Sequence, residues 1–214
     1  MKKYFTRLQI AIGVLFSFTT YAGGFSPKLT SQDQPWSITA SVGSGTYQVQ
    51  AFDRNSALGR LALGNEMLLA GDIALGLELG LQTGNKICLN LSRENQSFTK
   101  WHPVQTRLAP TLDLLVTTKT DPIGNSAFFA QFKGGVAYRH WKIERIPVNE
   151  ISQLAGEIQA GFGYPITALA SLSLLYQGIY GNSPNVQINH YSNKESLTNI
   201  PTLHAVLVGL SVNL

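Results

Sequence analysis

Six charged residues lie on the polar rows of segments in which apolar and polar residues alternate. They are Arg60, Glu78, Arg107, Asp113, Lys133 and Glu157. Side chains of both signs that face one another inside a protein can form a network of ion pairs, or they can line a narrow polar path for water and small ions. If successive segments pair, Arg60 comes near Glu78, Glu78 near Arg107, and Asp113 near Lys133, with Glu157 one strand further. We therefore expect an interior charge network, with ion pairs that fill the space as the preferred interpretation and a narrow small-solute pore as the alternative.

The second candidate is the sequence His190-Tyr191-Ser192-Asn193, in the polar segment 181–200. It resembles the His/Ser motif of outer-membrane lipid A 3-O-deacylases, and this resemblance implies that Ser192 would be the nucleophile and His190 its general base. An acidic residue orients the histidine in that family, whereas His204 stands at the start of the last predicted strand here. A polar surface loop is the preferred interpretation of the motif, with the deacylase as the alternative.

The remaining metal-binding residue types predict no further site. His102, His140 and His204 are scattered along the chain, without a spacing typical of metal ligands. Cys88 is the only cysteine, so the chain can form no internal disulfide and has no thiolate metal site. The sequence therefore predicts no metal and no cofactor.

Eight segments with apolar residues at every second position would hold the candidate residues, because a period of two is that of a β-strand. The clearest row is Ile73, Leu75, Leu77, Leu79 and Leu81. The eight segments are 36–43, 57–68, 73–82, 107–116, 128–139, 157–164, 170–177 and the closing segment 201–214. The composition is 44% hydrophobic and only 13% charged, yet no apolar stretch after residue 22 approaches the roughly 20 residues of a transmembrane helix.

These patterns predict an all-β fold, namely a single antiparallel transmembrane β-barrel of about eight strands with apolar rows toward lipid and small or polar rows inside. The alternative is a soluble lipocalin-like barrel with its apolar rows inside, which would leave the charged rows outside. Short gaps at 70–71, 121–125 and 165–166 indicate periplasmic turns, and the longer gaps 44–56, 83–102, 142–152 and 181–200 indicate outer loops. Because 83–102 contains further apolar residues, it could form another hairpin, so ten strands remain an alternative.

The N-terminus predicts export. Lys2, Lys3 and Arg7 precede a short apolar run at 10–18, and Thr20-Tyr21-Ala22 offers a cleavage site, so residues 1–22 are expected to be a signal peptide. A single membrane anchor is the alternative. Residues 23–34 would be a periplasmic lead-in and 35–214 the barrel. Without residues 1–22, 13 Lys and Arg face 12 Asp and Glu, and this near balance indicates no nucleic-acid partner.

The mature chain resembles the small outer-membrane β-barrels of Gram-negative bacteria, and most of all uncharacterised barrel proteins of intracellular gammaproteobacteria. The residues that carry this resemblance are 72–84, 112–117, Ser192-Asn193 and 199–211. The resemblance implies the bacterial outer membrane, contact with its lipid and lipopolysaccharide, and recognition of the C-terminal strand by the barrel-assembly machinery. It implies no activity.

The expected function is therefore that of a non-enzymatic, structural or surface-interaction barrel whose loops could bind an extracellular ligand. Lys86, Arg93 and Lys100 make one predicted loop mildly basic, a property that suits contact with lipopolysaccharide phosphates.

Overall fold

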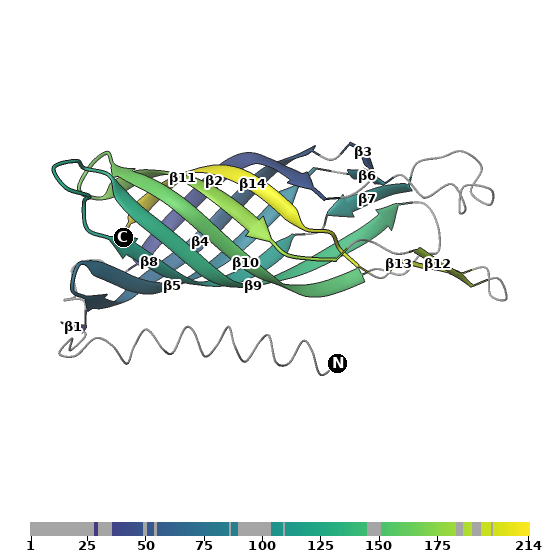
Figure 1. Cartoon of the computed structure of the whole chain (residues 1–214), viewed down its shortest axis with the longest axis horizontal. Coiled ribbons are helices and arrows are strands. Elements are labelled where there is room, and N and C mark those ends of the chain that lie inside the picture. Colours follow the sequence, from purple (N-terminus) through teal and green to yellow (C-terminus); the bar gives the residue numbers. More distant parts are fainter. Residues whose placement is uncertain are drawn as a thin grey trace.

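Eight long strands of the computed structural model form one antiparallel sheet that closes on itself (Figure 1). They are β2 (Trp36–Tyr47), β4 (Asn55–Ala70), β5 (Ile73–Gly84), β8 (Thr111–Thr120), β9 (Phe129–Glu144), β10 (Ile151–Pro165), β11 (Ala170–Ile179) and β14 (Leu203–Asn213). Each pairs with the next in this order, and β14 pairs with β2 to close the barrel. Closure satisfies the backbone hydrogen-bonding groups within the sheet, which is what lipid requires of a spanning structure. The prediction of a single antiparallel barrel of about eight strands is confirmed.

The structure describes most of the chain after residue 35. The described residues are 28–29, 36–48, 51–53, 55–85, 87–89, 104–108, 110–144, 151–182, 186–189, 194–197 and 199–214. Among them, no helix is long and apolar enough to cross a membrane.

Three short turns and the C-terminal residue lie at one end of the barrel, at the left of Figure 1, which we call the short-turn end. The tightest turn joins β4 to β5 through Gly71 and Asp72, and Gly71 has a φ of 61°, a left-handed conformation that glycine adopts without strain. The other two turns span 121–128 and 166–169. All three lie where the sequence predicts short turns.

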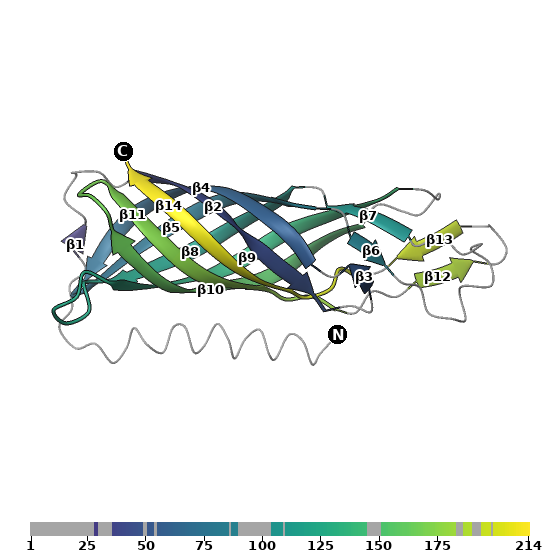
Figure 2. The ribbon, with the colours of Figure 1, turned by 90° about the horizontal axis from the view of Figure 1, so that it is seen from above.

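Small strands continue the sheet at the opposite end, which we call the extended end (Figures 1 and 2). They are β3 (Ala51–Asp53), β6 (Ile87–Leu89) and β7 (Val104–Leu108), while β12 (Val186–Asn189) and β13 (Lys194–Leu197) form a separate hairpin. A further short strand, β1 (Lys28–Leu29), pairs with β4.

The extended end differs from the sequence-based topology in two respects. First, β9 continues to Glu144 and β10 begins at Ile151, so both are longer than the predicted segments 128–139 and 157–164. The connection between them is therefore shorter than the expected loop 142–152. Second, the segment expected as a strand at 107–116 is divided between β7 and β8, and both parts pair with β9. β6 and β7 do form a hairpin, but it lies beyond the closed ring and adds no strand to it.

Apolar side chains form a continuous outward belt around the barrel. On β5, Leu77, Leu79 and Leu81 are 39–50% exposed, while the alternating Glu78 and Gln82 are buried. Outward apolar and inward polar rows are the pattern of a barrel in lipid, and a lipocalin-like arrangement has the opposite one. Exposed aromatic side chains, including the Phe128–Tyr164 pair with ring centroids 5.2 Å apart, lie at the short-turn end of this belt.

Candidate functional site in the barrel lumen

Four charged side chains from four strands meet in the lumen. Arg60 on β4 forms a two-pronged contact with Asp113 on β8, with Nε 3.0 Å from Oδ2 and Nη2 2.5 Å from Oδ1. The same Nη2 lies 2.8 Å from Oε1 of Glu78 on β5. Lys133 on β9 donates to both oxygens of Glu78, at 2.9 and 2.7 Å. Glu78 therefore joins two cations, and all four side chains are almost completely buried.

Alternation and one glycine create the space for this network. Each charged residue occupies an inward position, and Gly80 lies opposite Asp113 in the register of β5 and β8. A Cβ atom at Gly80 would collide with the Arg60 guanidinium and the Asp113 carboxylate. Glycine is thus required here for close approach, and the side chains fill the narrow interior expected of eight strands.

A second polar cluster, built from amides around one carboxylate, lies in the same lumen. Oε1 of Glu157 on β10 accepts hydrogen bonds from Nε2 of Gln159 at 2.7 Å and from Nε2 of Gln177 at 2.6 Å. Gln177 also donates to Oε1 of Gln82 at 2.8 Å. Because Gln159 pairs in register with Lys133, the amide cluster adjoins the ion-pair network.

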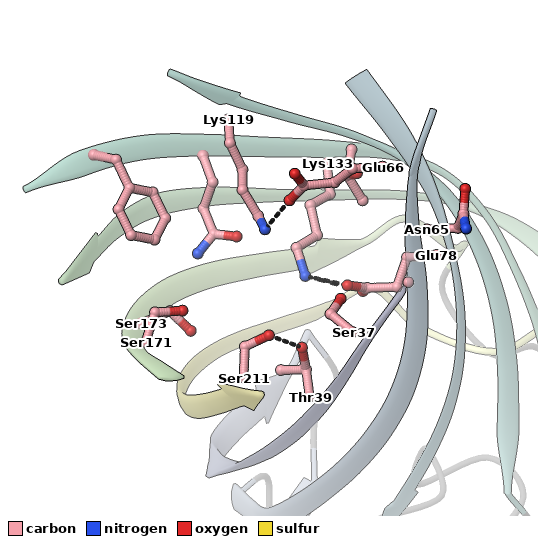
Figure 3. A pocket seen from close by; sticks show the side chains of 14 residues that line it. Ser37, Thr39, Asn65, Glu66, Glu78, Lys119, Lys133, Ser171, Ser173 and Ser211 are labelled. Atoms are coloured by element: carbon pink, nitrogen blue, oxygen red, sulfur yellow. Dashed lines mark hydrogen bonds and ion pairs between the residues drawn. The ribbon is translucent and has the colours of Figure 1, made fainter. Parts of the chain in front are cut away.

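A small polar cavity lies between the ion-pair network and the short-turn end of the barrel (Figure 3). Its volume is about 20 Å³, room for little more than one or two water molecules. Thr39 donates to Ser211 on the neighbouring strand at 3.0 Å within its wall, and an ion pair between Lys119 and Glu66 lies at its rim. Glu78 and Lys133 form part of its wall, so the cavity leads to the ion-pair network.

An apolar core fills the lumen at the extended end. It consists of Tyr47, Leu58, Ile87, Ala137, Trp141, Ile151, Ala155, Leu175, Ile179, Ile200, Leu203, Ala205 and Leu207. Tyr47 and Trp141 pack edge to face with centroids 5.8 Å apart. The sequence predicts small or polar residues on all inward rows, and this end of the lumen is instead packed like the interior of a soluble protein.

Arg139 fastens the segment that leads into β14 over this apolar core. Its guanidinium donates to the carbonyl oxygens of Pro201 at 2.7 Å and of Ile200 and Tyr180 at 3.2 Å. Gln153 accepts one hydrogen bond from Arg139 and another from the backbone N–H of Ile200. Ile200 is completely buried, so the segment closes the extended end of the lumen.

The six sequence-predicted lumen residues are only partly brought together. Arg107 lies on β7 opposite Lys142 of β9. The residue opposite Glu78 is Leu115 of β8. Leu115 follows Arg107 by about 26 Å of extended chain, at 3.3 Å per residue. The expectation that Arg107 approaches Glu78 is therefore wrong, because β7 pairs with β6 and β9, whereas the strand that pairs with β5 is β8. Asp113 takes Arg60 as its partner in place of the expected Lys133.

Sequence reasoning did not single out Arg139, Gln82, Gln159 or Gln177. The available signal was that each occupies an inward position on the same polar rows as the predicted charges.

The other sequence-predicted sites are not assembled by the described residues. His190 and Ser192 lie outside them, as do His102 and the basic residues Lys86, Arg93 and Lys100. His140 contacts Ser152 and His204 contacts Tyr176, on different strand pairs. Within the described ranges, no group of three or more His, Cys, Asp or Glu residues could hold a metal ion.

No protein-family model and no curated protein matches the chain. Among solved structures, Neisserial surface protein A matches with a TM-score of 0.46 and 9% identity, over 84% of this chain and 96% of that one. Ail, the attachment invasion locus protein of Yersinia pestis, matches with 0.47 and 8%, over 84% and 96%. A major outer membrane protein from Thermus thermophilus matches with 0.45 and 17%, over 84% and 99%.

Structural similarity at this level of identity gives no information on activity or ligands. The architecture of the chain itself indicates the membrane in which it lies. An even number of antiparallel strands, full closure and an outward apolar belt are the features of bacterial outer-membrane barrels. The protein is a transmembrane β-barrel of that membrane.

Proposed function

We propose that this protein is a non-enzymatic outer-membrane barrel with a sealed lumen, which presents its extended end to the cell exterior for envelope integrity or surface interaction. The observation that carries this proposal is the apolar core across the extended end of the lumen, closed by the segment that Arg139 fastens. Water and ions cross a barrel through a polar passage. A passage here would require the Tyr47–Trp141 pair and its apolar neighbours to separate.

The narrow pore is the less favoured alternative, since two more features oppose it. The polar cavity of about 20 Å³ ends against buried ion pairs, and those pairs occupy the middle of the lumen. Moving a solute past them would mean separating Glu78 from both Arg60 and Lys133, at the energetic cost of breaking buried charge pairs.

The extended end is the proposed interaction surface. The small strands β3, β6 and β7 and the hairpin of β12 and β13 lie beyond the closed ring, as the long outer loops of such barrels do. Loops carried on a rigid barrel are suited to binding because they tolerate sequence variation. The partners we propose are an extracellular ligand at this end, lipid and lipopolysaccharide around the belt, and the barrel-assembly machinery at β14.

Two finer assignments remain proposals from the sequence. One is export by a signal peptide at residues 1–22, followed by a periplasmic lead-in at 23–34. The other is kinship with the uncharacterised barrel proteins of intracellular gammaproteobacteria, supported by the residues quoted above. The lipid A deacylase remains a hypothesis, since no contact among the described residues favours it and both His190 and Ser192 lie outside them.

Cysteine labelling in intact cells tests the proposed orientation. In a Cys88→Ser background, Gln187→Cys places a thiol on β12, and the matched variant Asn125→Cys places one in an exposed short turn. A membrane-impermeant maleimide is expected to label Gln187→Cys in intact cells, and Asn125→Cys only after the outer membrane is permeabilised. Labelling of Asn125→Cys alone in intact cells would reverse the orientation and contradict the proposal.

A further inference from the structure

Glu157 differs from the other two lumen carboxylates because no cation pairs with it among the described residues. Glu78 and Asp113 are held by Arg60 and Lys133, whereas Glu157 receives only amide hydrogen bonds. The remaining buried cation of the lumen, Arg139, donates to backbone carbonyl oxygens and to Gln153. Glu157 is therefore the lumen carboxylate among the described residues whose charge no ion pair offsets. Arg139 balances the total charge of the buried lumen residues, but its guanidinium is engaged by neutral acceptors.

Three oxygen atoms of the same cluster also lack a hydrogen-bond donor. They are Oε2 of Glu157, Oε1 of Gln159 and Oε1 of Gln177, on side chains that are 0–1% exposed. The orientation of both amides is fixed, because each Nε2 already donates to Glu157 and that of Gln177 also donates to Gln82. Turning either amide would place its carbonyl oxygen against the Glu157 carboxylate, so that two acceptors would face each other. Buried acceptors left in this state are costly.

One monovalent positive charge bound at Glu157 would supply both an ionic partner for its carboxylate and a donor for the oxygen atom that lacks one. We propose that Glu157, Gln159 and Gln177 form a binding site for a single monovalent cation, either a sodium ion held by the three oxygens or a proton on Oε2 of Glu157. A divalent ion suits the cluster less well, because its second positive charge would meet no further unpaired carboxylate among the described residues.

The position of the cluster indicates the side from which the cation enters. The extended end is closed by the apolar core, while the polar cavity at the short-turn end reaches Lys133, the register neighbour of Gln159. The charged groups that face the site are Arg60, Asp113 and Lys133, with Glu78 beyond them and Arg139 on the opposite side. Because these groups stay paired with one another or with carbonyl oxygens, Glu157 is the group whose charge the cation offsets.

The test is the difference in unfolding temperature between Glu157→Gln and the wild type. The unfolding temperature is measured as the temperature at which the folded band is lost on a denaturing gel. Gln at this position keeps the acceptor for both amides, removes the charge and replaces the donor-less oxygen with an N–H₂ group. With choline as the only cation and at alkaline pH, we expect the variant to unfold about 5 °C above the wild type. Protons or sodium ions should raise the wild-type value and reduce the difference.

The two sources of charge give different results. If a proton fills the site, the folded state binds one more proton than the unfolded chain, and wild-type stability falls as pH rises, whatever the salt. If sodium fills it, exchange of choline for sodium at constant pH and ionic strength closes the difference. A difference that is the same at every pH and in both salts would overturn the proposal. A Glu157→Gln chain that fails to refold would also contradict the proposal, because the variant is expected to be more stable than the wild type with choline as the only cation.

Discussion

Replacement of Glu78 by alanine is expected to lower the free energy of unfolding by about 3–5 kcal/mol, the largest effect of any single substitution proposed for this barrel. Glu78 is the shared partner of Arg60, at 2.8 Å, and of Lys133, at 2.7 Å. Its removal leaves Lys133 without an anionic partner in a buried site, and Arg60 with Asp113 alone. Urea unfolding of the protein refolded in lipid vesicles, followed by tryptophan fluorescence, measures the loss.

The matched control is Glu66→Ala. Glu66 also pairs with a lysine, Lys119, but these two side chains are 34% and 27% exposed at the rim of the polar cavity. Water and salt screen such a pair, so the expected cost is below about 1 kcal/mol. Equal urea midpoints for Glu78→Ala and Glu66→Ala would mean that the lumen is hydrated around Glu78 and that the buried network does not exist as described.

Replacement of Leu77 by arginine is expected to cost about 2–4 kcal/mol, because Leu77 lies near the middle of the outward belt on β5 and a charge there faces hydrocarbon. Ile73→Arg introduces the same side chain on the same face of the same strand, beside the turn at the short-turn end. Arginine can reach the interface from that position, so about 0–1 kcal/mol is expected. The same vesicle unfolding assay measures both, and equal costs would show that the belt does not face lipid.

The strands could be predicted from the sequence because each inward or outward choice recurs at every second residue. Leu77 and Leu79 face outward and Glu78 inward for the same local reason, and a register error between strands would not change that. The interior charges followed from the same rule. Their pairing did not, since it depends on how far side chains reach across a register that only the folded barrel defines. Lys133 pairs with Thr117 of β8 along the sheet, yet its amine reaches past β8 to Glu78 on β5.

The closed extended end could not be anticipated from alternation alone. Leu175, Leu207 and Ile179 lie on inward rows whose other residues are mostly small or polar. From the sequence alone, an apolar residue in such a row could face either the lumen or the lipid. Their shared role is visible only in the folded barrel, where β11 and β14 bring them into one buried cluster with Trp141 and Tyr47. Arg107 was misplaced for a related reason: β7, on which it lies, pairs with β6 and β9 beyond the closed ring, and no periodicity in the sequence encodes that position.

A planar-bilayer recording of the purified wild-type protein is the most direct test of a sealed lumen. The apolar core and the fastened segment at Ile200 predict no single-channel steps, with incorporation of folded protein verified by its heat-modifiable band. Reproducible steps whose size changes in Glu78→Gln would show that ions pass the buried network, and would contradict the sealed barrel proposed here in favour of a narrow pore.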